Sequence, residues 1–138
     1  MGNYISFLTR CHELAEASAE LGNSPVGAVL IQDGVIIGEG MELARSSGDV
    51  TRHAEVECIR AAVLRLQTND LSDCELITTH EPCVMCSYVI RHYRIRKVVF
   101  EVAVPTVGGA SSKFPVLTDE TFWELRPVPE LIFWTKGR

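Results

Sequence analysis

Two short stretches of the chain combine residue types that bind metal ions and move protons. Residues 53–55 read His-Ala-Glu, and residues 82–86 read Pro-Cys-Val-Met-Cys. Zinc prefers thiolate sulfur and imidazole nitrogen in a tetrahedron, and the spacing of Cys83 and Cys86 lets both thiols bind one ion. With His53 as the third ligand, the fourth position of the metal stays open, which is typical of a catalytic zinc site.

Glu55 completes a site for hydrolysis. Zinc with an open position supplies a reactive water, because the metal lowers the pKa of that water from 15.7 to roughly 7. Glu55 is too close to His53 in sequence to be a natural fourth ligand, yet it is near enough to reach the water. We interpret it as the proton shuttle, which takes a proton from the water, delivers it to a ring nitrogen, and then protonates the departing amine. The pattern predicts replacement of an exocyclic ring amine by oxygen, with release of ammonia.

Each half of this pattern has a simpler interpretation when it stands alone. A lone Cys-x-x-Cys is often a structural knuckle or a redox pair, and a lone His-x-Glu carries almost no information. Here each half lies at the predicted start of a helix, where the helix dipole lowers thiol pKa values and favours thiolate. The combination favours catalytic zinc.

Composition and charge indicate one globular domain. The chain has 138 residues, 46% of them hydrophobic and 22% charged, so we expect a single domain over residues 1–138. The net charge of −5 argues mildly against binding a long polyanion by electrostatics alone. Five cysteines without regular spacing favour a reducing, cytoplasmic location. No apolar run is long enough to span a bilayer, so no membrane partner is expected.

Hydrophobic periodicity predicts the elements that must position these residues. Helices are expected over residues 3–21, 53–66 and 83–93, with a short one over 118–125. Strands are expected over residues 26–31, 35–38, 75–79, 97–102 and 131–134, and Asp33-Gly34 predicts a hairpin between the first two. Residues 44–51 are predicted to be a polar loop. Because strands alternate with helices after a hairpin, we expect a three-layer α/β/α sandwich with a mixed sheet.

Further matches, in order, extend this pattern over roughly residues 3–104, at residues 25–30, 37–40, 51–56, 81–86 and 94–100. With them the chain resembles the cytidine/deoxycytidylate deaminase-like superfamily. It is most similar to the branch of guanine deaminases, bacterial tRNA-adenosine deaminases and fungal-type cytosine deaminases. The resemblance implies a five-stranded mixed sheet, one Zn²⁺ per chain and a homodimer.

The resemblance also implies roles for individual residues. His53, Cys83 and Cys86 would hold the zinc, and Glu55 would be the general acid and base. A backbone amide at or near Cys83 would stabilise a developing oxyanion. The floor and edge of the base pocket would be formed by Val26, Gly27, Ala28 and Pro82.

Glu42 and Arg52, which both precede His53 in the chain, differ from the usual pattern of the branch. Glu42 stands where an Asn usually hydrogen-bonds the substrate, and an ionised carboxylate accepts hydrogen bonds without donating any. We expect Glu42 to meet an N–H or amino group of the substrate; the alternatives are that it faces solvent or that the register is one residue off. Arg52 is expected near the substrate, paired with Glu42, with Asp49, or with a substrate carbonyl or phosphate.

The C-terminal part of the chain also differs from the usual pattern of the branch. Relatives commonly close the pocket with a C-terminal helix, and no such helix is predicted here. Phe114, Phe122 or Trp123 would cover the pocket, unless these aromatics belong to the core. A basic cluster is either a solvated face or a place where nucleic acid or a dimer partner docks; it comprises Arg91, Arg94, Arg96 and Lys97.

Three functions remain open at this point. Deamination of a free nucleobase or related amino-heterocycle, such as guanine or cytosine, ranks first. Deamination of adenosine in tRNA ranks second, because the acidic charge and the missing helix speak against it although residues 81–86 match tRNA editors well. A zinc-binding module without turnover ranks third, since such a module has no need of Glu55.

Overall fold

A five-stranded sheet forms the middle layer of the computed structural model, which describes residues 3–121 and 127–135. In chain order the strands are β1 (Gly27–Gln32), β2 (Val35–Met41), β3 (Cys74–His80), β4 (Lys97–Val102) and β5 (Glu130–Phe133). They lie in the order β2-β1-β3-β4-β5. β1 runs antiparallel to β2 and β3, whereas β3, β4 and β5 are parallel, so the predicted mixed sheet is confirmed.

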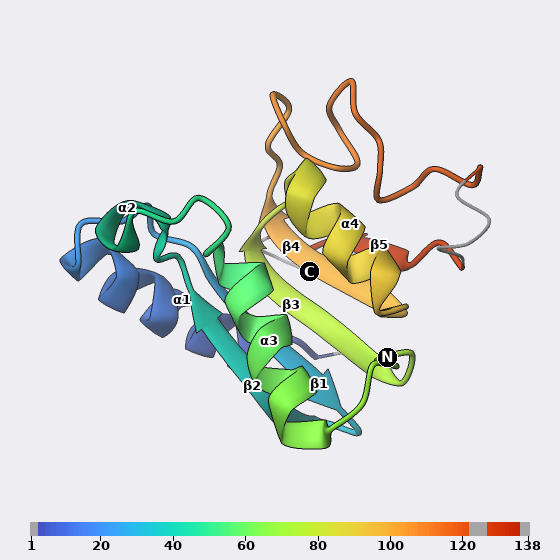
Figure 1. Cartoon of the computed structure of the whole chain (residues 1–138), viewed down its shortest axis with the longest axis horizontal. Helices are drawn as coiled ribbons and strands as arrows, with labels where there is room; N and C mark the ends of the chain where they lie inside the picture. Colours follow the sequence, from blue (N-terminus) through green and yellow to red (C-terminus); the bar gives the residue numbers. More distant parts are fainter. Residues whose placement is uncertain (1–2, 122–126, 136–138) are drawn as a thin grey trace.

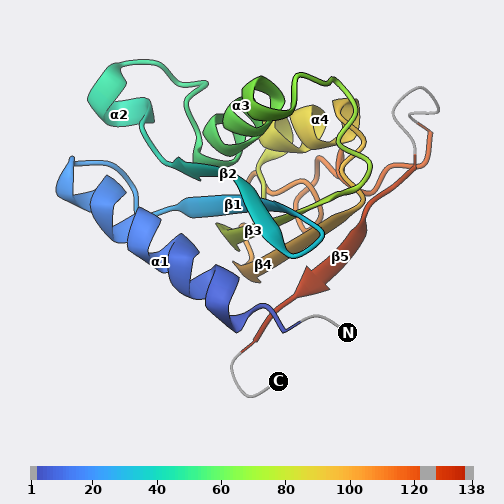
Figure 2. The same cartoon turned by 90° about the horizontal axis from the view of Figure 1, so that it is seen from below.

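Helices cover both faces of this sheet. Helix α1 (Ile5–Glu20) lies on one face, and α3 (Ala54–Leu66) and α4 (Val84–His92) lie on the other (Figures 1 and 2). The predicted three-layer α/β/α sandwich is therefore confirmed. Within the described ranges no helix is long and apolar enough to cross a membrane.

The central strands are apolar on both sides because each has a helix layer above and below it. On β1, Ala28 and Leu30 belong to the core beneath α3 and α4, whereas Val29 and Ile31 pack with α1. Successive side chains of a strand point to opposite faces, so a strand buried on both faces reads as a continuous apolar run.

The hairpin between β1 and β2 also forms as predicted. Asp33 and Gly34 have φ values of 51° and 77°, the positive values that a two-residue hairpin turn requires. Two local predictions were less accurate. The polar loop expected over residues 44–51 contains a one-turn helix, α2 (Ala44–Ser47). Of the short helix expected over residues 118–125, residues 118–121 are not helical and the others lie outside the described ranges.

Gly40 allows α3 to lie directly on β2. A Cβ atom at this position would collide with the backbone of Ala54 and Cys58 in the first turns of α3. The absence of a side chain at Gly40 therefore lets α3 begin at this place, and with it sets the position of the predicted ligand His53, the residue before the helix.

We expect Gly40→Ala to lower the free energy of unfolding by about 1–3 kcal/mol, because the added methyl group overpacks the contact between β2 and α3. Urea unfolding measures this loss. The control is Gly34→Ala in the hairpin turn, where a Cβ meets nothing within 4 Å. The control should also cost stability, through its positive φ, but it should leave the zinc content unchanged, whereas Gly40→Ala should reduce it. Equal zinc content in the two variants would contradict this role of Gly40.

Candidate metal centre and active site

The predicted metal ligands come from the starts of two helices. His53 is the N-cap of α3 and Cys83 is the N-cap of α4, and both have extended backbone conformations. Cys86 lies in the first turn of α4. The N-terminal ends of the two helices lie at the same end of the molecule (Figure 1), so the sheet brings together residues that are 30 positions apart. Pro82 lies one residue before the N-cap, where its missing N–H costs the helix nothing.

The distances within this group fit a zinc ion. His53 Nδ1 lies 3.5 Å from Cys83 Sγ and 3.6 Å from Cys86 Sγ, and the three atoms lie within 4.8 Å of one another. Zinc bound tetrahedrally, at about 2.0 Å from nitrogen and about 2.3 Å from sulfur, separates the two kinds of ligand atom by about 3.5 Å. The structure thus brings the whole predicted ligand set together with the spacing that zinc needs.

Glu55 lies beside this ligand set without belonging to it. Its carboxyl group is in the first turn of α3 and the residue is only 4% exposed. Oε1 lies 3.7 Å from Cys86 Sγ, and Oε2 accepts a hydrogen bond from Thr78 Oγ1 at 3.5 Å. Burial raises the pKa of Glu55 to about 7, a range in which a carboxyl group both takes up and releases protons near neutral pH.

The two thiols differ in acidity because Cys86 donates a hydrogen bond to Cys83. The pKa of Cys83 is lowered to about 4, first by the hydrogen bond from Cys86 and then by the one from His53. The pKa of Cys86 is raised, first by the same bond to Cys83 and then by burial. One thiolate therefore forms readily in this group, and thiolate is the form that binds zinc.

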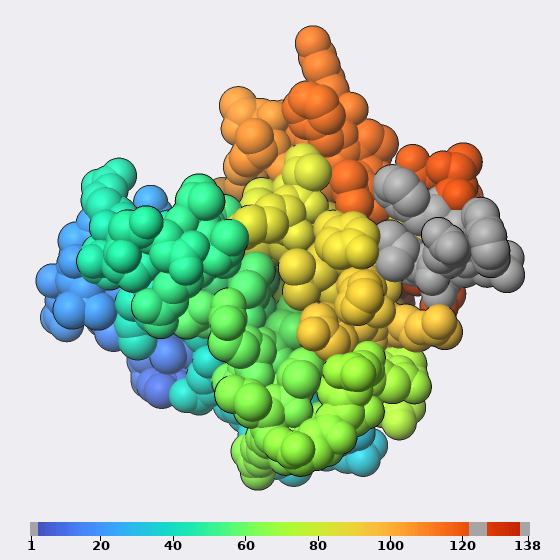
Figure 3. Space-filling view, viewed as in Figure 1, coloured from blue at the N-terminus to red at the C-terminus, as the bar shows by residue number. Residues whose placement is uncertain are grey.

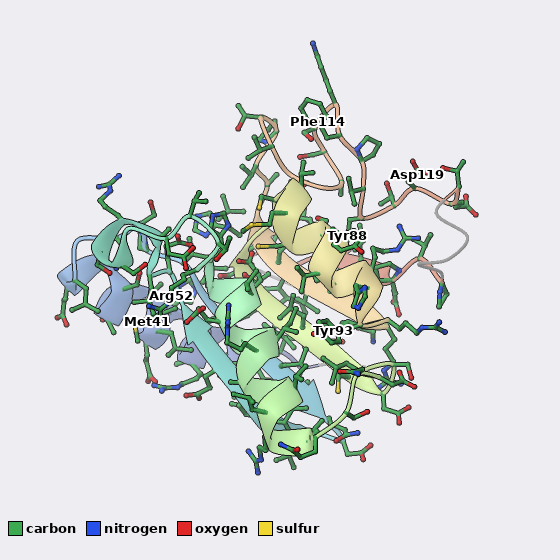
Figure 4. The ribbon with its side chains drawn as sticks, in the orientation of Figure 1. Met41, Arg52, Tyr88, Tyr93, Phe114 and Asp119 are labelled. Atoms are coloured by element: carbon green, nitrogen blue, oxygen red, sulfur yellow. The ribbon has the colours of Figure 1, made fainter. Side chains whose placement is uncertain are left out.

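The ligands open onto a hollow of about 410 Å³. Its lining residues are His53, Cys83, Val84, Met85, Val107 and Phe114. Phe114, one of the residues expected to cover the pocket, is 54% exposed and lies on the loop beyond the N-terminal end of α4 (Figure 4). Phe122 and Trp123, the other candidates, lie outside the described residues.

Other residues predicted to form the pocket lie deeper in the fold. Gly27 packs against the backbone of α1, and Ala28 is fully buried in the core. Pro82 is buried and its carbonyl accepts a hydrogen bond from the Gly109 amide at 2.8 Å. Val26 is partly buried at the edge of the same core. Contact of these four residues with a substrate stays a prediction.

Arg52 has a different partner from those considered. Its Nη2 lies 3.0 Å from Glu57 Oε1 in α3, so the expected pairing with Glu42 or Asp49 is wrong. Glu57 lies in the first turn of α3, and its side chain therefore reaches back to the residue just before the N-cap. Figure 4 shows Arg52 at this end of the helix.

Glu42 is half-buried and close to the site. Its Oε2 accepts a hydrogen bond from the Ala44 amide at 3.4 Å. The pKa of His53 is raised to about 9, mainly by Cys83 and to a smaller extent by the negative charge of Glu42. Contact of Glu42 with a substrate stays a prediction.

Three of the four basic residues after Ile90 have separate partners within the chain. Arg91 is 1% exposed and donates hydrogen bonds to the carbonyls of Val116 and Asp119. Arg96 pairs with Glu75 at 2.8 Å, and Lys97 lies 3.7 Å from Glu130. Arg91 is buried, unlike Arg96, because it lies on the inward face of α4. Arg94 and Arg96 are exposed, so docking of nucleic acid or of a dimer partner at this face stays a prediction.

Glu81 was not predicted from the sequence, although it is a buried residue next to the site. It is 2% exposed, and its carboxylate accepts hydrogen bonds from the loop that follows β4. The sequence does contain a signal for its role. Glu81 is an acidic residue between a predicted strand and Pro82, and a Gly- and Ser-rich loop later in the chain can supply hydrogen-bond donors to it.

Comparison with known proteins defines the class. Residues 1–102 match the family model of the cytidine and deoxycytidylate deaminase zinc-binding region. The chain therefore belongs to this family of zinc-dependent deaminases. The resemblance, the zinc cofactor and the hydrolytic deaminase class that were predicted from the sequence are confirmed, and the interpretation as a module without turnover is set aside.

Individual relatives are more specific. The chain is 39% identical over 121 residues to the tRNA-specific adenosine deaminase of Aquifex aeolicus, covering 84% of this chain and 80% of that protein. A structure from a study of A-to-I editing by tRNA:A34 deaminases at the wobble position of transfer RNA has a TM-score of 0.88 at 29% identity, covering 96% of this chain and 100% of that chain. Guanine deaminase from Bacillus subtilis has a TM-score of 0.70 at 40% identity, covering 74% of this chain and 66% of that chain.

These relatives correct the ranking of substrates made from the sequence. Deamination of a free nucleobase was ranked first, but the relatives that match at high coverage are tRNA-specific adenosine deaminases, and the structure with a TM-score of 0.88 comes from tRNA:A34 deaminases. The ranking relied on two features, the C-terminal helix that was not predicted and the net charge of −5. The charge is a sum over the chain and does not describe the surface around the site.

Cys83→Ser should lose zinc, because the oxygen that replaces sulfur is a poor zinc ligand and the remaining two ligands hold the ion weakly. Elemental analysis of purified protein should show a zinc content far below one per chain. The control is Cys74→Ser at the far end of β3, which makes the same change at a buried thiol outside the ligand group and should keep its zinc. Stoichiometric zinc in Cys83→Ser would contradict the assignment of Cys83 as a ligand.

Proposed function

We propose that this protein is a tRNA adenosine deaminase, which converts adenosine to inosine in a tRNA substrate. The observation that carries the proposal is the group His53, Cys83 and Cys86 with the buried Glu55 at its side, in a chain that shares its fold with tRNA:A34 deaminases over the full length of the compared structure. Hydrolytic deamination of adenosine replaces the amino group on C6 of the base by oxygen and releases ammonia.

The chain's own residues divide the work between binding and proton transfer. His53, Cys83 and Cys86 would hold the zinc ion, which when bound supplies a water of lowered pKa. Glu55 is placed to take both protons of the attacking water in turn at its carboxylate: the first passes to a ring nitrogen of the base, and the second passes to the departing amine, which leaves as ammonia. Its burial keeps bulk water from competing for these transfers.

The hollow beside the ligands suits a base that has been flipped out of a nucleic acid. Its wall of Val84, Met85, Val107 and Phe114 is apolar, and apolar and aromatic side chains pack on the faces of flipped bases. We assign Glu42 to an N–H or amino group of the substrate, because it is a half-buried acceptor whose negative charge acts on His53 and Glu55. Substrate contacts of Val26, Gly27, Ala28, Pro82 and Arg52, and a covering role for Trp123, belong to the same proposal.

The substrate assignment is tested with an RNA hairpin that carries a tRNA anticodon with adenosine at the wobble position. We expect the zinc-loaded protein to form inosine in this RNA and to release little ammonia from free guanine, cytosine or adenine. Ammonia release from a free base together with an unchanged RNA would overturn the tRNA assignment.

Glu55→Gln should keep its zinc and fold but lose about 10²–10⁴-fold in kcat, because the amide has nearly the same shape and cannot carry the proton. Inosine formation under saturating RNA measures the loss, and elemental analysis confirms that zinc remains. Glu39→Gln, which changes a carboxylate on β2 paired with Arg10, is the matched control and should keep full activity. Wild-type kcat in Glu55→Gln would exclude Glu55 as the proton shuttle.

We also propose that the chain forms a homodimer through the surface of α3 and α4. A groove of about 440 Å³ runs between the two helices, and Leu64 and Tyr88 in its lining are 65% and 51% exposed. Figure 3 shows this face, with α3 in green beside α4 in yellow, and Figure 4 shows Tyr88 on α4. Large exposed apolar side chains grouped on one face are typical of protein interfaces. A second copy of the chain is the partner that the family resemblance implies.

Tyr88→Asp should shift a dimer toward monomer, because a charge replaces a large apolar anchor; a loss of about 2 kcal/mol weakens association about 30-fold. Sedimentation equilibrium measures the dissociation constant. Leu21→Asp changes a comparably exposed apolar residue outside the groove and should leave the constant unchanged. A monomeric wild type, or a dimer unaffected by Tyr88→Asp, would contradict this interface.

Two broader assignments accompany these proposals. We assign residues 1–138 to one zinc-dependent deaminase domain, supported by the single sheet that all strands of the described chain share. We assign the protein to the cytoplasm, because its metal site depends on reduced thiols and Cys11, Cys58, Cys74, Cys83 and Cys86 are all free.

A further inference from the structure

The carboxylate of Glu81 is buried next to the metal centre and accepts four hydrogen bonds from one loop. Glu81 Oε1 accepts hydrogen bonds from the Val104 amide at 2.9 Å and from Ser111 Oγ at 2.6 Å. Glu81 Oε2 accepts from the amides of Ala110 at 2.8 Å and Ser111 at 2.7 Å. Four donors from the segment between residues 104 and 111 therefore converge on one side chain that is 2% exposed.

Only an ionised carboxylate meets this set of donors. It offers two oxygens and no hydrogen, so each oxygen accepts two bonds here. A glutamine in the same place would turn an NH₂ group toward two donors, which would leave those donors without an acceptor. The shape of the loop matches this side chain, because a Cβ at Gly108 would collide with the Glu81 carboxylate.

The same loop lies directly against the start of α4. The Val84 amide donates to the Val107 carbonyl at 3.0 Å, and the Gly109 amide donates to the Pro82 carbonyl at 2.8 Å. Cys83 and Gly108 form an isolated antiparallel bridge. Residues 104–114, named here the anchored loop, are thus held by Glu81 on one side and by the backbone around Cys83 on the other.

The anchored loop carries the outer wall of the hollow at the metal centre. Val107 and Phe114 line that hollow and are 47% and 54% exposed (Figure 4 labels Phe114). Side chains so exposed are held in place by the path of their backbone rather than by the core. That path is set by the four bonds to Glu81 together with the backbone bonds to Pro82 and Val84.

We infer that Glu81 is a positioning residue for substrate binding: its carboxylate holds the anchored loop so that Val107 and Phe114 form the wall against which the base packs. The inference rests on the proposed function for the identity of that base. Glu81 neither binds zinc nor touches the substrate, because both of its oxygens are occupied by the loop.

Glu81→Gln tests this inference with almost no change in side-chain volume. In zinc-loaded protein, hydrogen–deuterium exchange at the amides of Val104, Ala110 and Ser111 should become faster by about tenfold or more, the scale of one lost hydrogen bond to a charged group. KM for the anticodon RNA hairpin should rise by about tenfold, the scale of one lost stacking contact with a base. Zinc content should stay at one per chain, and kcat should change less than KM.

Two further variants separate positioning from a general loss of stability. Glu39→Gln removes a carboxylate that accepts two hydrogen bonds from Arg10, at 2.8 Å and 2.9 Å, far from the hollow, and it should leave KM and exchange in the anchored loop unchanged. Ser111→Ala removes one of the four bonds and should change both readouts in the same direction as Glu81→Gln by a smaller factor. If Glu81→Gln does not fold, Ser111→Ala by itself tests the inference with the same two measurements.

Unchanged exchange in the anchored loop of both variants would overturn the inference. Loss of zinc with a fall in kcat and an unchanged KM would also overturn it, since Glu81 would then support the metal rather than the wall. The exchange measurement needs no substrate, so it decides the anchoring step even if the protein does not deaminate RNA. In that event KM is measured with the amino-heterocycle that the wild-type protein does turn over.

Discussion

The meeting of two helix N-termini at one end of the sheet is the constraint on which the remainder of the structure depends. His53 and Cys83 are the caps of these helices, and their ligand atoms lie 3.5 Å apart although the residues belong to different halves of the chain. β1 lies between β2 and β3, the strands that lead into the two helices, so the spacing between the caps is set by strand pairing. A metal bound at this point would join the two halves and couple its own affinity to folding.

Around the metal centre, helices position the ligands and Glu55, whereas a loop forms the outer wall of the hollow. The ligands and Glu55 lie at helix starts that are backed by a core buried on both faces of the sheet. The outer wall of the hollow comes from a loop, and loops carry much of the specificity of enzymes because their sequence changes without disturbing the core. In this protein the two parts are connected through Glu81, which lies between β3 and Cys83 and binds the loop that follows β4.

The elements and the metal centre were predictable because their signals are local and specific. The helices and strands follow from periodicity, and few structures other than a metal site need one histidine and two cysteines with this spacing. α2 has only four residues, too few to show a period. The partner of Arg52 depends on how the chain enters α3, and the role of Glu81 depends on a loop that returns from β4, so neither could be read from neighbouring residues.

The substrate was the least predictable feature, for a chemical reason. Removing an amine from a free base and from a flipped nucleotide needs the same ligands and the same proton shuttle, so His53, Glu55, Cys83 and Cys86 do not distinguish the two reactions. Phe114 and Val107 are exposed at the rim of the hollow, and the net charge over the whole chain carries no information about that local surface.

X-ray absorption at the zinc edge of the purified protein measures the metal centre most directly. The structure predicts two sulfur neighbours at about 2.3 Å and an imidazole nitrogen at about 2.0 Å from the metal. A shell of four sulfurs, or one without sulfur, would contradict a centre built from His53, Cys83 and Cys86.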